Sequence, residues 1–394
     1  MTRRALFPAA LALGALFTVT AAPPAAADAI RDRQWGLLAL RADEAWGTTM
    51  GEGVTVAVLD TGVDPTHPDL AGQVMEGADL VGIGAVRGDR AWARHGTAMA
   101  GIIAGHGHGT DRKKGILGIA PAAKILPVRV ILEEGDPGRD KARESKGGAL
   151  AEGIRWATDH GADVINLSLG DDSSSAHHDA AEDEAVQYAL GKGVVVVASA
   201  GNGGKSGDRI SYPAAYPGVI AVTAVNRENK KASFSTRSWY ATVSAPGVNV
   251  VIADPDRSYY NGWGTSAASA YVSGAVALVR AVHPDLSPAQ IKNLLEDTAS
   301  SPPRGGRDDS RGFGLVDPVA ALQKADELSP EPVLPVPVAS GSTYFGAGPD
   351  PVRDPGLWAR FGAPAGVAAG LALLVAAGVL ARRPGAGRRD PDAG

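Results

Sequence analysis

Five apolar runs rich in Val and Ile constrain the fold of this chain more than any other feature. They are VTVAVLD (54–60), AKILPVRVI (123–131), ADVINLSL (162–169), VVVVASA (194–200) and VIAVTAV (219–225). Continuous apolar runs, rather than apolar and polar residues in alternation, predict strands that are covered on both faces. Helix-like segments such as GTAMAGIIAG (96–105) and GALAEGIRWATDHG (148–161) lie between them. The sequence therefore predicts an α/β fold with a doubly wound, mostly parallel sheet flanked by helices.

Charge and cysteine content exclude several classes of function. The chain has 394 residues and a formal net charge of -5, which gives no basic surface, so we expect no nucleic-acid partner. Without cysteines it has no disulfides, no thiolate metal site and no cysteine nucleophile. Its length suffices for one large domain with appendages.

The N-terminal residues have the layout of a secretory signal. Arg3 and Arg4 are followed by an apolar run and then by Ala25, Ala26 and Ala27. We predict a signal peptide over residues 1–27, cleaved after Ala27. An uncleaved membrane anchor is the alternative, and the arginine pair would also suit the twin-arginine export route.

A second apolar segment predicts a single transmembrane helix. Residues 361–381 contain no charged side chain and as a helix would span about 31 Å, enough to cross a bilayer. Arginines in the tail 382–394 predict that this end is cytoplasmic and that the main domain lies outside the cell membrane. The alternative is a buried core helix. Residues 328–360, rich in Pro and Gly, predict a linker.

Three polar residues stand at the ends of predicted elements, in the order Asp60, His95 and Ser266. Asp60 ends the first strand, His95 precedes GTAMAGIIAG, and Ser266 begins a helix that follows GWGT. Each of them alone would also suit a turn cap, a structural histidine or an N-cap serine. Together they supply the carboxylate, imidazole and hydroxyl that acyl transfer on a peptide requires.

The helix that begins at Ser266 is built from small residues. They include Ala267, Ala268, Ala270, Gly274 and Ala277. Small side chains would let this helix lie against its neighbours without displacing the serine hydroxyl. A misplacement of about 1 Å at such a site can cost about 100-fold in rate.

The motifs D-T-G, H-G-T and G-T-S around these three residues, in this order, resemble those of the subtilisin-like serine proteases, the subtilases. The resemblance covers residues 51–325, and it implies a peptidase domain over about 53–327. It implies that Ser266 is the nucleophile, His95 the general base and Asp60 the residue that orients the imidazole. The expected substrate is an extended polypeptide, and no cofactor is implied.

The same resemblance extends to the surroundings of the triad. Asn202 in ASAGNGG matches the family's oxyanion-hole asparagine. Binding of the substrate strand and the walls of its S1 pocket are implied for Ser168, Leu169, Gly170, Ala200 and Gly201. The family usually has a bulkier residue at Ala267 and often proline at Ala270. The related sedolisins share G-T-S-A but lack the histidine, and no G-x-S-x-G, the α/β-hydrolase motif, brackets Ser266.

Within the subtilases, the ends of the chain resemble those of the mycosins, membrane-anchored proteases associated with type VII secretion. This implies the type VII secretion machinery as a partner. The extension 28–52 is too short for a folded inhibitory prodomain, so we expect it to pack on the main domain. Its expected anchors are Trp35, Leu37, Leu38 and Trp46. A domain that chiefly stabilises a secretion complex, with proteolysis secondary, is the alternative function.

Two further polar segments are not assigned to the predicted active site. The histidines of GHGHG, His106 and His108, lack a carboxylate at metal-site spacing, so we predict no metal site there. No calcium-ligand pattern is present. Residues 133–148, EEGDPGRDKARESKGG, have no apolar periodicity and predict a flexible surface loop that could lie near the substrate cleft.

Overall fold

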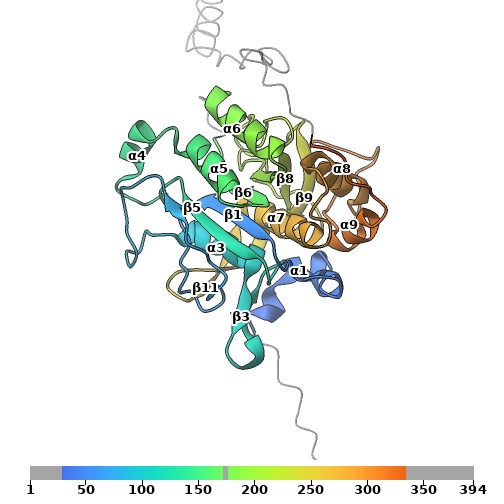
Figure 1. Cartoon of the computed structure of the whole chain (residues 1–394), viewed down its shortest axis with the longest axis horizontal. Helices are drawn as coiled ribbons and strands as arrows, with labels where there is room; N and C mark the ends of the chain where they lie inside the picture. Colours follow the sequence, from blue (N-terminus) through green and yellow to red (C-terminus); the bar gives the residue numbers. More distant parts are fainter. Residues whose placement is uncertain (1–28, 172–175, 334–394) are drawn as a thin grey trace, which may run out of the picture. The chain divides into compact units, whose positions relative to one another are not determined.

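The predicted strand runs form five adjacent strands of one parallel sheet in the computed structural model, which describes residues 29–171 and 176–333. They are β1 (Thr55–Asp60), β5 (Lys124–Arg129), β6 (Val164–Leu167), β7 (Val195–Ser199) and β8 (Ile220–Val225). With β2 (Ala78–Asp79) and β9 (Ala241–Pro246) at its edges, the sheet has the order β2-β5-β1-β6-β7-β8-β9 (Figure 1). Every strand pair in it is parallel, which confirms the predicted class of fold.

The strand order reverses at β1. After β1 the chain adds β2 and β5 on one side and then returns to add β6 on the other. In open parallel sheets, ligands bind beyond the carboxyl ends of the strands at such a reversal. Asp60 is the last residue of β1, so its carboxylate is placed at this point.

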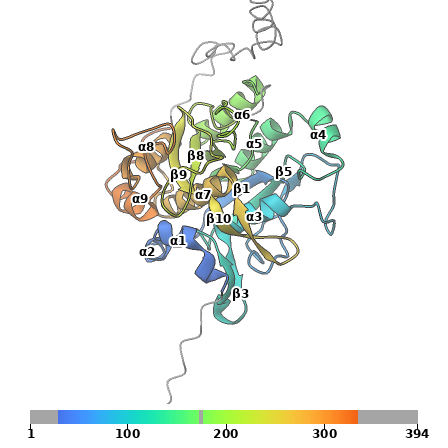
Figure 2. The same ribbon diagram turned by 180° about the vertical axis from the view of Figure 1, so that it is seen from behind.

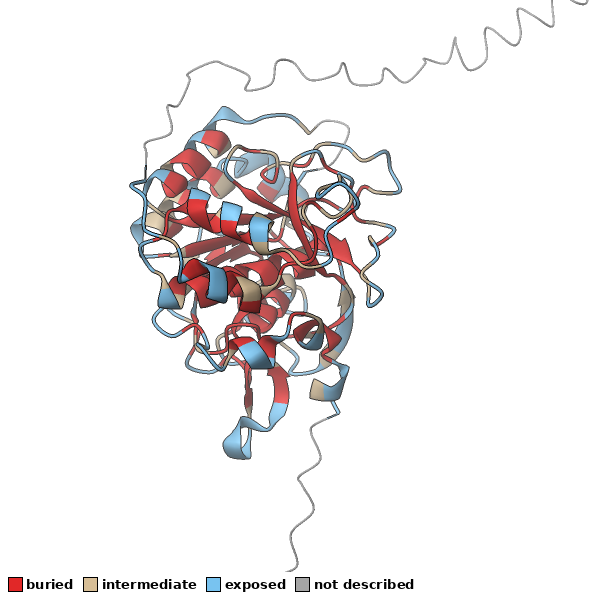
Figure 3. Cartoon of the chain, turned by 90° about the vertical axis from the view of Figure 1, so that its right-hand side faces the viewer, coloured by how far each residue is buried: buried red, intermediate tan, exposed pale blue. Residues whose placement is uncertain are grey.

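Helices cover both faces of the sheet (Figures 1 and 2). One core contains Val56 and Val58 of β1 with α3 (Arg94–Ala104) and α7 (Thr265–Val282). The opposite core contains Ala57 and Leu59 with α5 (Ala149–Asp159) and α6 (Ala180–Gly191). Because successive strand residues point to opposite faces, a sheet covered on both sides needs apolar residues at every position. Figure 3 shows buried residues on the strands and on the helix faces turned toward them.

Helix α7 lies in the centre of the first core. It is the one helix among the described residues that is long and apolar enough to cross a membrane, but 83% of it is buried inside the domain. A Cβ added at Gly274 would stand 1.6 Å from Ile119 Cγ2, so the small residue is required for this packing. The predicted signal peptide (1–27) and transmembrane helix (361–381) lie outside the described residues.

The N-terminal extension packs on the domain through two short helices, α1 (Trp35–Ala39) and α2 (Ala42–Ala45). The indole N–H of Trp35 donates to the carbonyl oxygens of Val248 and Asn249, each at 3.1 Å. The indole of Trp46 donates to Ile119 O at 2.8 Å. Leu38 was wrongly predicted as an anchor: its neighbour Leu37 is buried, whereas Leu38 is 73% exposed because it lies on the outer side of α1.

The remaining elements lie at the edges of the domain. Two hairpins are formed by β3 (His106–His108) with β4 (Lys114–Leu117), and by β10 (Val248–Ala253) with β11 (Tyr259–Trp263). Helices α8 (Pro288–Thr298) and α9 (Pro318–Ala325) follow α7.

The prediction of a flexible loop at 133–148 is wrong for much of that segment. It contains α4 (Arg139–Ser145), whose Ala142 is buried against Val81 and Leu132. Asp136 is also buried, and its carboxylate accepts hydrogen bonds from the backbone N–H groups of Ala85 and Gly138, each at 2.7 Å. The apolar contacts of Ala142 and the backbone bonds to the Asp136 carboxylate help to hold the segment, and neither leaves a periodic pattern in the sequence.

Candidate active site

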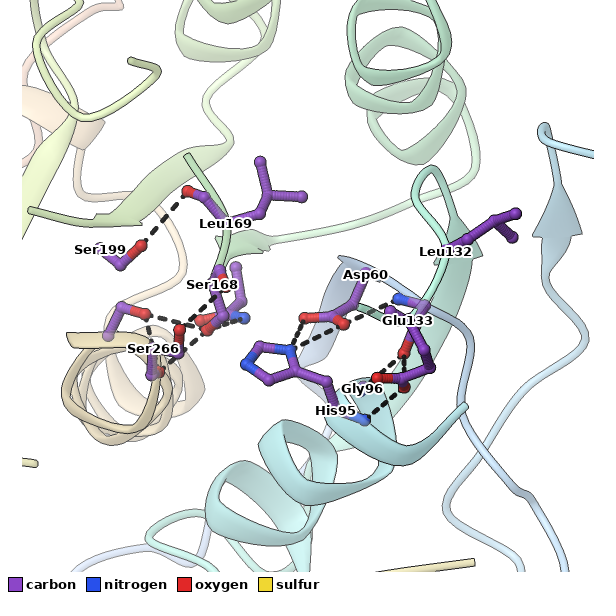
Figure 4. Close-up of polar contacts among 12 residues, drawn as sticks. Asp60, His95, Gly96, Leu132, Glu133, Ser168, Leu169, Ser199 and Ser266 are labelled. Atoms are coloured by element: carbon purple, nitrogen blue, oxygen red, sulfur yellow. Dashed lines mark hydrogen bonds and ion pairs between the residues drawn. The ribbon is translucent and has the colours of Figure 1, made fainter. Parts of the chain in front are cut away.

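Asp60 and His95 meet at the carboxyl end of β1. Asp60 is fully buried, and its two carboxylate oxygens lie 2.9 and 2.8 Å from His95 Nδ1 (Figure 4). The backbone N–H of Thr61 donates to the same carboxylate at 2.7 Å. This arrangement fixes the orientation of the imidazole, because Nδ1 faces the carboxylate and Nε2 is left for the other side of the ring.

Glycine 96 allows this close approach. A Cβ at Gly96 would stand 2.0 Å from the carbonyl oxygen of Gly62, in the turn that follows β1. The first turn of α3 can therefore lie directly against the end of β1, and His95, in that turn, reaches Asp60. The glycine of the H-G-T motif thus has a packing role.

Glu133 also belongs to this site, although the sequence predicted it only as part of a charged surface loop. Its Oε1 accepts hydrogen bonds from the backbone N–H of His95 and from the hydroxyl of Thr61, both at 2.7 Å (Figure 4). Glu133 comes soon after β5, the strand that pairs with β1. Its place beyond the end of a strand next to β1 is the signal that could have found it.

The charges around His95 raise its pKa. Burial of the ring lowers the pKa, but the charge and hydrogen bond of Asp60, with the charge of Glu133, outweigh burial and raise it from 6.5 to about 9. The side chain is still 36% exposed, on the side of the cleft. The imidazole can therefore accept a proton readily, and its exposed part lies on the cleft.

Ser266 lies at the start of α7, on the same cleft as His95. Its Oγ donates a hydrogen bond to the carbonyl oxygen of Ser168 at 3.0 Å. Among the residues that the structure describes, no hydrogen bond joins this hydroxyl to His95, and Figure 4 shows the edge of the imidazole that faces away from Asp60 turned toward Ser266. The structure thus brings Asp60 and His95 into contact and places Ser266 beside them without that second bond.

Asn202 is held at the start of α7. Its amide oxygen accepts hydrogen bonds from the backbone N–H of Thr265 at 3.0 Å and from the Thr265 hydroxyl at 3.1 Å. Because the oxygen is directed at Thr265, the amide nitrogen is the end that can be presented to the cleft, which Asn202 lines together with Ser266.

The cleft has a volume of about 870 Å³ and runs past His95, Ser168, Gly201, Asn202 and Ser266. Leu169 and Gly170, for which the sequence predicted substrate binding, also line it. The expectation for Ala200 is wrong: this residue is fully buried and is absent from the lining, whereas Ser199 and Gly201 line the cleft. Extended backbone alternates its faces, so Ala200 points to the core between them.

Gly170 is required by close packing at this wall. A Cβ at this position would stand 2.7 Å from the hydroxyl oxygen of Ser211 and 3.0 Å from the carbonyl oxygen of Tyr212. The segment 168–170 therefore lies against the chain around Ser211, and a larger residue would push these two walls apart.

The histidines of GHGHG are engaged elsewhere. The ring nitrogens of His106 lie 2.7 and 2.9 Å from the carbonyl oxygens of Gly107 and Ala71, and His108 contacts Asp69 at 2.6 Å. Within residues 29–171 and 176–333, no group of three or more His, Asp or Glu side chains could hold a metal ion.

Comparison with known proteins agrees with this fold. Residues 51–314 match the subtilase family, Peptidase_S8. Over 73% of its length the chain is 38% identical to subtilisin DY from Bacillus licheniformis, and the match covers 98% of that protein. It is 40% identical to fervidolysin from Fervidobacterium pennivorans over 73% of this chain, but the match spans only 43% of fervidolysin.

The chain is also similar to a solved structure. The crystal structure of MycP1 from Mycobacterium smegmatis has a TM-score of 0.63 and 31% identity, covering 74% of this chain and 85% of that one. The family match includes every strand of the parallel sheet and the residues on both walls of the cleft. The chain therefore belongs to the subtilase family of serine endopeptidases.

Proposed function

We propose that Asp60, His95 and Ser266 form the catalytic triad of this chain, and that it hydrolyses exported proteins while anchored in the cell membrane. The main support for the triad is the contact of His95 Nδ1 with the buried carboxylate of Asp60. His95 and Ser266 line the same cleft. The carboxylate fixes the tautomer in which Nε2 is the proton acceptor.

In the acylation step, Ser266 Oγ forms a bond to the substrate carbonyl carbon while its proton passes to His95 Nε2. His95 then gives that proton to the amine as the peptide bond breaks, which leaves an acyl-enzyme. Water repeats the sequence to release the acid and restore Ser266. The hydroxyl must first leave Ser168 O for the imidazole, and rotation about the Cα–Cβ bond of Ser266 supplies that movement.

The negative charge on the substrate oxygen needs donors that are in place before the reaction. The amide nitrogen of Asn202 and the backbone N–H of Ser266, in the first turn of α7, are suited to this role. The hydrogen bonds of Asn202 with Thr265 hold the asparagine at that helix end. A donor fixed in this way stabilises charge that appears only in the transition state.

The substrate is proposed to be an extended polypeptide. Segment 168–170 follows β6 along the wall of the cleft, where a substrate peptide could add as a further strand. Gly201 and Ser199, rather than Ala200, would then form the opposite wall of the pocket for a substrate side chain.

The proposed location of this protein at the cell membrane is supported by the sequence and by one group of relatives. A predicted signal peptide and a charge-free segment at 361–381 followed by arginines support export and a single membrane anchor. MycP1 of the ESX-1 type VII secretion system is 31% identical to this chain, with a TM-score of 0.63. These likenesses support a role beside a type VII secretion system.

Hydrolysis of a peptide anilide by the full chain tests the enzymatic part. The parent should release product, and Ser266→Ala should not. Extraction of membranes with alkaline carbonate tests the anchor: the full chain should stay with the membrane and a variant ending at residue 360 should be released. Equal release of both variants would contradict the anchor.

The scaffold role is the second candidate, and the predicted stalk and anchor are what favour it. Complementation of a deletion strain separates the two. If proteolysis is the main function, Ser266→Ala should fail to restore secretion although the protein accumulates to the parent level. Full restoration would instead favour a structural role.

A further inference from the structure

We propose that Glu133 is a positioning residue for the reaction: its carboxylate caps α3 from outside that helix and holds the backbone of His95 so that the imidazole meets Asp60. This inference rests on the proposed catalytic role of His95. It assigns a function to a residue in the segment 133–148, for which the sequence predicted a flexible surface loop that could lie near the substrate cleft.

Helix α3 lacks a cap of its own. Its N-cap residue is Ala93, which has no polar side chain and a left-handed backbone with a φ of 57°. The first N–H groups of a helix have no partner within the helix, and a Ser, Thr, Asp or Asn side chain at the N-cap usually accepts from them. At α3 this acceptor must come from another part of the chain.

Glu133 and Thr61 supply it together. Glu133 Oε1 accepts from the backbone N–H of His95, and Thr61 Oγ1 accepts from the backbone N–H of Gly96 at 3.1 Å. The Thr61 hydroxyl in turn donates to Glu133. A carboxylate at a helix N-terminus is also favoured by the helix dipole. The two side chains thus satisfy the turn that carries His95.

The same network is tied to Asp60. The backbone N–H of Thr61 donates to the Asp60 carboxylate, and Val130 N–H donates to the Asp60 carbonyl oxygen at 2.9 Å. Three residues later the chain reaches Glu133, after Leu132 has been buried under α4. Asp60 is the last residue of β1, and the backbone of His95 is held by Glu133, which follows β5. A shift of Glu133 would therefore move His95 relative to Asp60.

The carboxylate also adds to the charge around the imidazole. The charged groups that act on His95 are Asp60, Glu133 and Arg139, of which the first two raise its pKa and Arg139 lowers it. Arg94, next to His95 in α3, is bound to Asp254 at 2.7 Å and does not pair with Glu133. Glu133 therefore stabilises the imidazolium that forms when Ser266 loses its proton.

Glu133→Gln and Glu133→Ala separate the two effects. Gln keeps an acceptor oxygen for both donors and removes only the charge. We expect the acid limb of the kcat/KM pH profile to move to lower pH, with kcat reduced severalfold. Ala removes the acceptor as well, so kcat should fall about tenfold or more while KM changes little, since a loosened His95 is misplaced.

Glu134→Gln is the matched control, because it removes the same charge from the next residue. Glu134 is exposed and lines the same cleft as Glu133, but it makes no hydrogen bond or ion pair with the rest of the described chain. Its acid limb should move much less than that of Glu133→Gln. Thermal unfolding of each variant shows whether the domain is folded, and Glu133→Gln carries the test if Glu133→Ala does not fold.

A parent-like pH profile in Glu133→Gln together with a parent-like kcat in Glu133→Ala would overturn the proposal. An equal shift in Glu133→Gln and Glu134→Gln would also overturn it, since the effect would then be one of general charge. Activity retained by Ser266→Ala is a different result: it would remove the proposed function itself, whatever the Glu133 variants do.

Discussion

Ser266 and Ser168 exchange hydrogen bonds in the lining of the cleft. The hydroxyl of Ser266 donates to the carbonyl oxygen of Ser168 at 3.0 Å, and the hydroxyl of Ser168 donates to the carbonyl oxygen of Ser266 at 2.9 Å. Ser168 Oγ also accepts from the amide of Asn166 and lies 2.9 Å from the hydroxyl of Ser269. The pair joins the start of α7 to the wall on which a substrate would lie.

Replacing Ser168 with Ala should therefore affect stability and rate together. The variant leaves the buried Asn166 amide without this acceptor, so we expect a loss of about 1–3 kcal/mol in the free energy of unfolding. Urea unfolding measures it. A lower kcat should accompany the loss, because the start of α7 is less firmly held. Parent values for both quantities would contradict this role of the pair.

Two substitutions of Asn202 test whether its amide N–H stabilises the substrate oxyanion. Asn202→Asp keeps an oxygen that can accept from Thr265 but has no N–H for the substrate oxygen. We expect kcat to fall about 10²- to 10³-fold, a range taken from a subtilisin asparagine, with little change in KM. Asn202→Ala should lose a similar factor in kcat and also unfold at a lower temperature, because the contacts with Thr265 are gone. A kcat within a fewfold of the parent in both variants would exclude Asn202 from the reaction.

The raised pKa of His95 predicts the pH dependence of the rate. The neutral imidazole is the base, so kcat/KM should rise with pH and reach its plateau only on the alkaline side of the usual 6.5, with a midpoint near 9. A peptide ester assayed from pH 5 to 10 measures this. An acid limb centred below pH 6.5 would contradict the conclusion that Asp60 and Glu133 raise the pKa of His95.

The same shift has a consequence for stability. Because the folded pKa of His95 lies above the unfolded one, the stabilisation from its contact with Asp60 is complete below about pH 6.5 and is lost as the pH rises through about 9. Asp60→Asn should weaken this dependence. Comparison of urea unfolding at pH 6 and pH 10 in the parent and in the variant measures the difference.

Gly274 in α7 and Gly191 in α6 allow a matched test of how tightly each helix is packed. Gly274 of α7 faces Ile119, so Gly274→Ala should cost about 1–3 kcal/mol. Gly191, the last residue of α6, has open space around it, so Gly191→Ala should stabilise by about 0.4–1 kcal/mol. Thermal unfolding distinguishes the two. A neutral Gly274→Ala would show that α7 can move away from Ile119.

The sequence predicted the sheet because burial on both faces leaves continuous apolar runs, as at Val56–Leu59 where alternate residues enter opposite cores. It also predicted that Asp60 and His95 would be close, since each stands at an element end. Glu133 was not recognised from its place after β5 alone, because its role depends on two donors that are distant in the chain, the backbone N–H of His95 and the hydroxyl of Thr61. Ala200 was misplaced because one residue of register decides which side chains face the cleft.

Mapping the adduct of a fluorophosphonate probe shows which serine is the nucleophile. If Asp60, His95 and Ser266 form the triad, peptide mass spectrometry should find the phosphonyl group on Ser266 of the parent, no labelling in Ser266→Ala, and much slower labelling in His95→Ala, where the proton acceptor is missing. An adduct on another serine, or undiminished labelling of Ser266→Ala, would contradict it.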